Sequence, residues 1–195
     1  YSSPTIGRST DKIVHSPDLI PLWLKALTSD ELDLQRQAAD TIVIARRQEM
    51  EGLEEMLPGL MEILKQPDPH PTVLAAVCRA IIALDHQPAA PQLLDLVKQD
   101  QPLLCQLIEP GLAHWKDPEA IQVWRTRLEH PGRSLPLSLL AVRCLQQVED
   151  QASVEALESI AIDPSMSISL RIEAARAVGV LATEPRISSV EKLKA

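Results

Sequence analysis

The sequence predicts an all-α protein, an α-solenoid of about five helix-turn-helix repeats. Three observations predict this fold. The same amphipathic pattern returns five times along the chain, at intervals of 31 to 39 residues. The apolar 45% of the chain is mainly Leu, Ile, Val and Ala, with no Phe, and Leu and Ala favour helices. Most of the sixteen prolines fall between the apolar runs, where proline starts or ends a helix.

The repeated element is a helix of about twelve residues. Its five copies begin at Leu34, Val73, Leu104, Leu137 and Leu170. If the first residue of each copy is position 0, positions 0, 4, 7, 8 and 11 are mostly apolar or small, and they form one stripe on a helix. This stripe predicts the buried side. Pro110 falls inside the third copy, so we expect it to interrupt and bend that helix.

A second amphipathic segment precedes each copy and predicts the first helix of each repeat. These segments are Leu19–Leu27, Leu53–Leu64, Gln92–Val97, Ala120–Leu128 and Val154–Ile162. Short breakers rich in Asp, Ser and Pro separate the two helices, and Asp and Ser favour helix starts. The predicted organisation is an N-terminal arm or linker over residues 1–15, five repeats over 16–183, and the start of a sixth repeat or a C-terminal cap over 184–195.

The last copy reads Leu-Arg-Ile-Glu-Ala-Ala-Arg-Ala-Val-Gly-Val-Leu. It resembles the HEAT-repeat family, and more closely the short bacterial repeats of the phycobilisome-lyase type, whose helix reads Val-Arg-x-x-Ala-Ala-x-Ala-Leu-Gly-x-Leu. The Pro67-Asp68 turn matches too, whereas the first and third copies depart from the pattern. The resemblance implies a right-handed, armadillo-like solenoid with its first helices on a convex wall and its second helices on a concave wall.

The concave wall carries the predicted binding surface. Its outward positions hold arginines with apolar neighbours, namely Arg36, Arg79, Leu139, Arg143, Ile172 and Arg176. Arginine offers forked donors to carboxylate or phosphate, so this row predicts a site for an acidic or phosphorylated peptide. The alternative is that each arginine pairs with a neighbouring acid such as Glu173 and has no further role.

The predicted function is therefore a non-catalytic scaffold that binds another protein or peptide. We expect this scaffold to be part of a longer chain. A net charge of −8 argues against general binding of nucleic acid. No catalytic motif and no set of metal ligands occurs, so we expect no enzyme activity, metal or cofactor. The alternatives are an enzyme or small-ligand binder like the related bilin lyases, or a purely structural spacer. The sequence does not predict the oligomeric state.

Other features predict less. The longest apolar run is too short to span a membrane. Three widely spaced cysteines favour a reducing compartment, and so the cytoplasm over export, while the N-terminus is not informative. Cys105 opens a helix, where a thiol pKa can fall, so it is the candidate reactive thiol. Trp124 is expected in the core, or else in a secondary contact with Arg125 and Arg127.

Overall fold

The computed structural model describes residues 16–182, and over this range the chain is helical, with no strand. The predicted arm at 1–15 and the predicted cap or sixth repeat at 184–195 lie outside the described residues. The first helices are α1 (Ile20–Leu27), α3 (Leu57–Leu64), α5 (Ala90–Val97), α7 (Pro118–Glu129) and α9 (Val154–Ile162). The second helices are α2 (Leu32–Arg47), α4 (Pro71–Ala83), α6 (Pro102–His114), α8 (Leu135–Gln147) and α10 (Ile168–Leu181).

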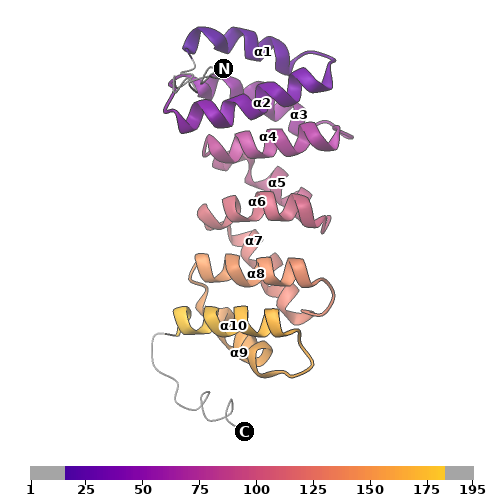
Figure 1. Cartoon of the computed structure of the whole chain (residues 1–195), viewed down its shortest axis with the longest axis vertical. Helices are drawn as coiled ribbons and strands as arrows, with labels where there is room; N and C mark the ends of the chain where they lie inside the picture. The colour runs from indigo at the N-terminus through magenta and orange to yellow at the C-terminus, as the bar shows by residue number, and fades with distance from the viewer. Residues whose placement is uncertain (1–15, 183–195) are drawn as a thin grey trace, which may run out of the picture.

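The helices stack in pairs. Each first helix packs against the second helix that follows it, and we call each such pair a unit, numbered one to five. The second helices also contact one another in series, α2 with α4, α4 with α6, α6 with α8 and α8 with α10. Figure 1 shows these five helices one below another along the long axis, with α3, α5, α7 and α9 behind them. In the described part of the chain, no helix combines the length and apolarity needed to cross a bilayer.

Short 3-10 helices lead into four of the five first helices. They are η1 (Pro17–Leu19), η2 (Leu53–Met56), η3 (Gln87–Ala89) and η4 (Gln151–Ser153). The predicted segment Leu53–Leu64 is helical throughout, but its first four residues form the tighter 3-10 turn and the α-helix begins at Leu57. Four units end their second helix with a left-handed residue, at Glu49, Asp85, Lys116 and Glu149. That conformation turns the chain back towards the next first helix.

The predicted buried stripe is confirmed for its central positions. Position 4 of every second helix is buried, and position 8 is fully buried in all but α10, where Val178 is half-buried. The prediction fails at position 0 of unit one. Leu34 is 41% exposed, whereas Val73, Leu137 and Leu170 are buried at the same position. The reason is that position 0 faces the preceding second helix, and no helix among the described residues precedes α2 on that side.

The two sides of each second helix have separate partners. Position 7 faces the preceding unit: a Cβ added at Gly111 would lie 2.9 Å from Cγ2 of Ile82 on α4. Position 5 faces the following unit, and it is fully buried in the first four units, at Ala39, Cys78, Glu109 and Val142. In α10 the same position, Ala175, is exposed. The burial of positions 5 and 7 therefore agrees with the helix contacts, in which each second helix packs against the one before it and the one after it.

The prediction that Pro110 interrupts the third second helix was wrong. Helix α6 runs unbroken from Pro102 to His114, with Pro110 exposed inside it. A proline removes one backbone hydrogen bond, and on an exposed face water can bind the freed carbonyl instead. The proline carbonyl itself accepts a hydrogen bond from Nε2 of Gln147 on α8, at 3.4 Å.

Candidate functional site

The predicted binding residues lie along the exposed side of the second helices. We call the surface formed by positions 2, 6 and 10 of α2, α4, α6, α8 and α10 the second-helix face. The side chains of Arg79, Arg143 and Arg176, all at position 6, are 42%, 62% and 73% exposed. Pro110 holds the same position in α6 and is exposed as well. The predicted row with a gap at Pro110 is therefore found on one side of the stack.

The arginines of units one and two share one carboxylate. Asp40 accepts a hydrogen bond from Nη2 of Arg79 at 2.8 Å and another from Nη1 of Arg36 at 3.2 Å. A second carboxylate, Asp33, lies 3.5 Å from Arg36. Two positive and two negative charges therefore meet here, and this cluster is neutral overall. The structure brings Arg36 and Arg79 together although 43 positions separate them in the sequence.

The arginines of units four and five share Glu173 in the same way. Glu173 accepts a hydrogen bond from Nε of Arg143 at 2.7 Å, and its other oxygen lies 3.6 Å from Nη1 of Arg176. The carboxylate is largely covered, with a side chain 16% exposed, while both guanidinium groups extend into solvent. Two positive charges against one negative leave this cluster one charge positive. Pairing with Glu173 was the alternative to a binding role for these arginines, and it is present.

Apolar side chains lie beside the C-terminal cluster. Ile172, at position 2, is 49% exposed, and Val180, at position 10, is 63% exposed. Leu139, also predicted in the site, is half-buried and packs partly against the core. Position 10 was not singled out in the sequence, although Ile44 and Val180 both occupy it and both are exposed. A wider apolar stripe beside the arginines could have been predicted from those two residues.

Near the middle of the stack, polar contacts join unit two to unit three. Asp85, at the end of unit two, accepts a hydrogen bond from the indole Nε1 of Trp115 at 2.6 Å. His114 is exposed, with its Nε2 3.9 Å from the same carboxylate. Trp115 is only half-buried, so its predicted place in the core is confirmed in part.

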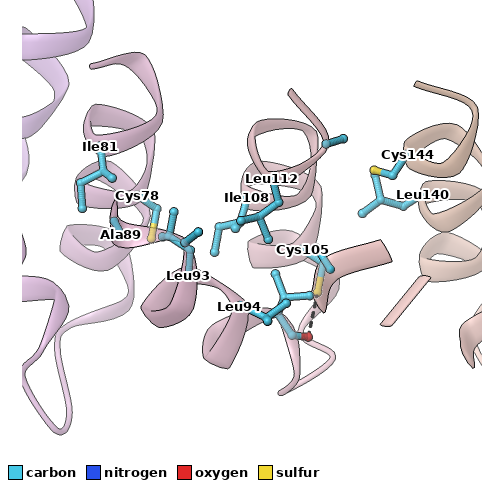
Figure 2. Packing of buried hydrophobic residues seen from close by; sticks show 14 of the residues in the cluster. Cys78, Ile81, Ala89, Leu93, Leu94, Cys105, Ile108, Leu112, Leu140 and Cys144 are labelled. Atoms are coloured by element: carbon cyan, nitrogen blue, oxygen red, sulfur yellow. Dashed lines mark hydrogen bonds between the residues drawn. The ribbon is translucent and has the colours of Figure 1, made fainter. Parts of the chain in front are cut away.

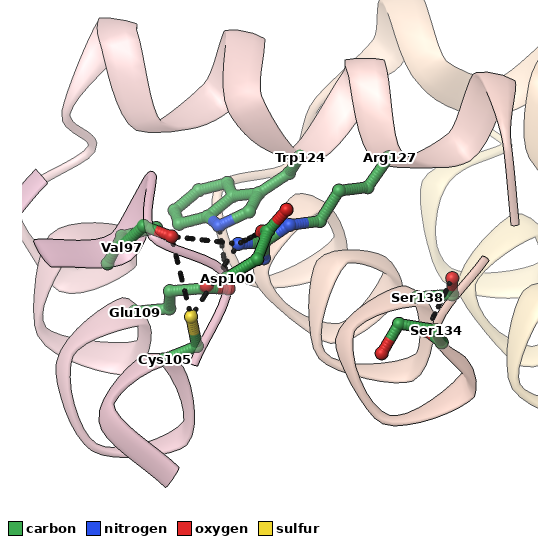
Figure 3. Close-up of polar contacts among 8 residues, drawn as sticks. All are labelled: Val97, Asp100, Cys105, Glu109, Trp124, Arg127, Ser134 and Ser138. Carbon is green, nitrogen blue, oxygen red and sulfur yellow. Dashed lines mark hydrogen bonds and ion pairs between the residues drawn. The ribbon is translucent and has the colours of Figure 1, made fainter. Parts of the chain in front are cut away.

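A second polar cluster is buried between units three and four (Figure 3). Glu109 of α6 is fully buried and accepts hydrogen bonds from Nη1 of Arg127 at 2.6 Å and from the indole of Trp124 at 2.9 Å. Arg127 also donates to Asp100 at 3.0 Å. Burial raises the pKa of Glu109 above its ordinary value, while Arg127 opposes the rise. Trp124 is fully buried, which confirms its expected place in the core. Arg125 and Arg127 bind acids of their own chain, Asp150 and Glu109.

The cysteines are packing residues. Cys78, Cys105 and Cys144 lie on α4, α6 and α8 among aliphatic side chains (Figure 2), and each is free and buried. Burial raises the pKa of the Cys78 and Cys105 thiols to about 12, and it raises the pKa of Cys144 as well. For Cys105, burial is the largest cause and Glu109 adds to the rise, while Arg127 opposes it. Full burial and a raised pKa both argue against the predicted reactivity of this thiol.

The histidines hold no metal-binding geometry. Among the described residues, no three His, Cys, Asp or Glu side chains lie close enough together to bind a metal ion. His70 instead caps α4, where its Nδ1 accepts from the backbone N–H of Thr72 at 3.4 Å.

The sequence matches no model of a known protein family, and no curated protein matches it significantly.

Proposed function

We propose that this chain is a non-catalytic interaction scaffold that binds another protein or peptide on the second-helix face. We further propose that the five units form a right-handed α-solenoid of HEAT-like repeats, with the second-helix face on its concave side. Support comes from the serial stacking of the second helices and from the repeated roles of positions 4, 5 and 7. Such a stack offers a long surface that no single compact core could provide.

The observation that carries the proposal is the row of exposed arginines held by carboxylates. In the C-terminal cluster, Arg143 uses Nε to bind Glu173, so its two terminal nitrogens stay available. A guanidinium already held in place loses less side-chain entropy when it binds a ligand. The favoured partner is an acidic or phosphorylated peptide, because arginine binds carboxylate and phosphate with forked hydrogen bonds.

The apolar residues next to the arginines support a peptide over a free ion. Ile172 and Val180 are exposed on the same helix as Arg176. Protein-binding surfaces commonly combine arginine with exposed apolar side chains, whereas a free ion would gain nothing from the latter.

The test is a peptide array in which phosphoserine or glutamate peptides are compared with their alanine counterparts. The variant replaces Arg79, Arg143 and Arg176 with Gln. The matched control replaces the exposed Lys25, Lys65 and Lys116 with Gln, which changes the net charge equally. We expect the arginine variant to lose acidic peptides by about tenfold or more, and the lysine control to keep them. Equal binding by both variants would overturn the proposal, provided that circular dichroism shows both to be folded.

A further inference from the structure

A cavity of about 580 Å³ lies at the boundary of units three and four. One side of α7 forms its wall, and the turn between α5 and α6 and the first turn of α8 close its ends. Cavities of roughly 300 to 1,000 Å³ are typical of sites for small molecules. The arginines of the second-helix face do not line this cavity, so it is a separate feature of the molecule.

The cations of the cavity wall differ in whether acids neutralise them. Lys98 pairs with Asp95 and Glu119, and Arg127 pairs with Glu109 and Asp100. Arg133 makes no ion pair with any of the described residues, and it is exposed at the rim. The unneutralised charge of Arg133 favours an anionic ligand over a cationic one.

The positive charge at the inner end of the cavity is fixed in position. Arg127 is 11% exposed, and its guanidinium is held between Glu109 and Asp100, at 2.6 Å and 3.0 Å (Figure 3). Its Nε is buried and has no hydrogen-bond partner among the described residues. Because two carboxylates hold and neutralise Arg127, it forms a rigid part of the cavity wall.

The opposite end of the cavity offers further donors. Ser134 precedes α8 and makes no side-chain capping bond, unlike Asp117 before α7 and Ser167 before α10. The first turn of α8 therefore keeps uncapped backbone N–H groups beside the cavity, at the positive end of a helix of 13 residues. Arg133, directly before it in the chain, is exposed at the rim.

The cavity also has an apolar portion. Val123 of α7 and Leu137 of α8 both line it, and Leu137 is buried. An inorganic anion would leave these side chains without a partner, whereas a ligand with an apolar body would cover them.

We propose that this cavity binds a small organic molecule that carries an oxyanion, a phosphate or a carboxylate, joined to an apolar body. The oxyanion lies between Arg133 and the first turn of α8, and the apolar body lies against Val123 and Leu137. The site is additional to the peptide surface proposed above and does not depend on it.

The test uses isothermal titration calorimetry on the whole 195-residue chain with phenyl phosphate, benzoate, inorganic phosphate and benzylamine as probes. We expect one phenyl phosphate or one benzoate to bind per chain, more tightly than inorganic phosphate, with no binding of benzylamine. The comparison of the two aromatic anions tells which oxyanion the site prefers. Binding should weaken as salt is added, since the rim is open to solvent.

Two variants and one control locate the binding. Arg133→Gln should weaken the tighter aromatic anion about five- to tenfold, and Thr126→Trp, which fills the cavity, should abolish its binding. Arg46→Gln, an exposed arginine on α2 outside the cavity, should bind as the parent chain does. The proposal is overturned if neither aromatic anion binds at concentrations up to about 10 mM. It is equally overturned if benzylamine binds as tightly, or if Arg46→Gln and Arg133→Gln weaken binding alike.

Discussion

At the scale of single residues, Glu109 is the strongest departure from the repeat. Position 5 holds Ala39, Cys78, Val142 and Ala175 in the other units, all small or apolar. In unit three it holds a carboxylate that is fully buried between Arg127 and Trp124. A buried charge is tolerated only when its partners satisfy it, so the burial of Glu109 depends on Arg127 and Trp124 of unit four.

We predict that Glu109→Ala lowers the free energy of unfolding by about 3 kcal/mol, because Arg127 stays buried with one carboxylate fewer and the Trp124 indole loses its acceptor. Urea unfolding followed by circular dichroism measures the change. Adding Arg127→Met removes the orphaned charge as well, so the double variant should recover about half of the loss. A single variant within about 0.5 kcal/mol of the parent would contradict this account.

The buried thiols predict a dependence of stability on pH. Their folded pKa values lie above the value of 9.0 of a free thiol, since burial disfavours the thiolate. The unfolded chain therefore loses these protons first as pH rises, so their contribution is intact below pH 9 and lost between pH 9 and about 12. We expect native protein to resist a thiol reagent at pH 8, and all three cysteines to react in concentrated guanidinium chloride. A variant with alanine at the three sites should show a smaller loss of stability above pH 9.

At the scale of elements, the second helices determine how closely the units approach. In α6, two neighbouring residues act in opposite directions. Pro110 is exposed and costs the helix one backbone hydrogen bond, whereas Gly111 faces α4 and leaves room for Ile82. Helix propensity alone would favour replacing both, because Ala exceeds Pro and Gly as a helix former.

We predict that Pro110→Ala raises the free energy of unfolding by about 1 to 2 kcal/mol, because alanine restores the backbone hydrogen bond that proline removes. This figure already subtracts the conformational entropy that the unfolded chain gains when proline is replaced. Gly111→Ala should lower it by about 1 kcal/mol, because a Cβ would lie 2.9 Å from Ile82 and the clash outweighs the gain in propensity. Thermal melts of the two variants measure both changes. In an Ile82→Ala background the second substitution should become neutral or stabilising; an unchanged penalty there would show that Ile82 is not its cause.

At the scale of the whole molecule, the units form a series in which each second helix contacts the one before and the one after. Position 5 reports this order, since it is buried in α2, α4, α6 and α8 and exposed in α10. At the other end of the described stack, Leu34 is exposed for the same reason.

Ala39 and Ala175 test the series directly, because both are alanines at position 5. Ala39→Arg should cost several kcal/mol, about 3 or more, since it places an unpaired charge between α2 and α4. Ala175→Arg should change the free energy of unfolding by no more than about 0.5 kcal/mol. Chemical unfolding of both variants provides the comparison. A large cost at Ala175 would mean that another part of the chain covers α10.

The helices were well predicted, and the candidate site less so. The five second helices begin and end within two residues of the predicted copies, because a period of 3.6 residues is a local signal. The exposure of Arg79, Arg143 and Arg176 followed from the same period. Glu173 was named in the sequence as a possible partner of the arginines, whereas Asp40 was not. The contacts that join units, Asp40 with Arg79 and Glu173 with Arg143, depend on how neighbouring helices pack.

The sequence by itself determined the all-helical class, the pairing of helices and the side of each helix that is buried. These depend on apolar periodicity and on proline and glycine signals between nearby residues. Only the tertiary structure decided that Glu109 is buried against Arg127, that Cys105 is fully buried, and that a cavity opens beside α7. Each of these depends on distances between residues far apart in the chain, and a periodic pattern carries no such distances.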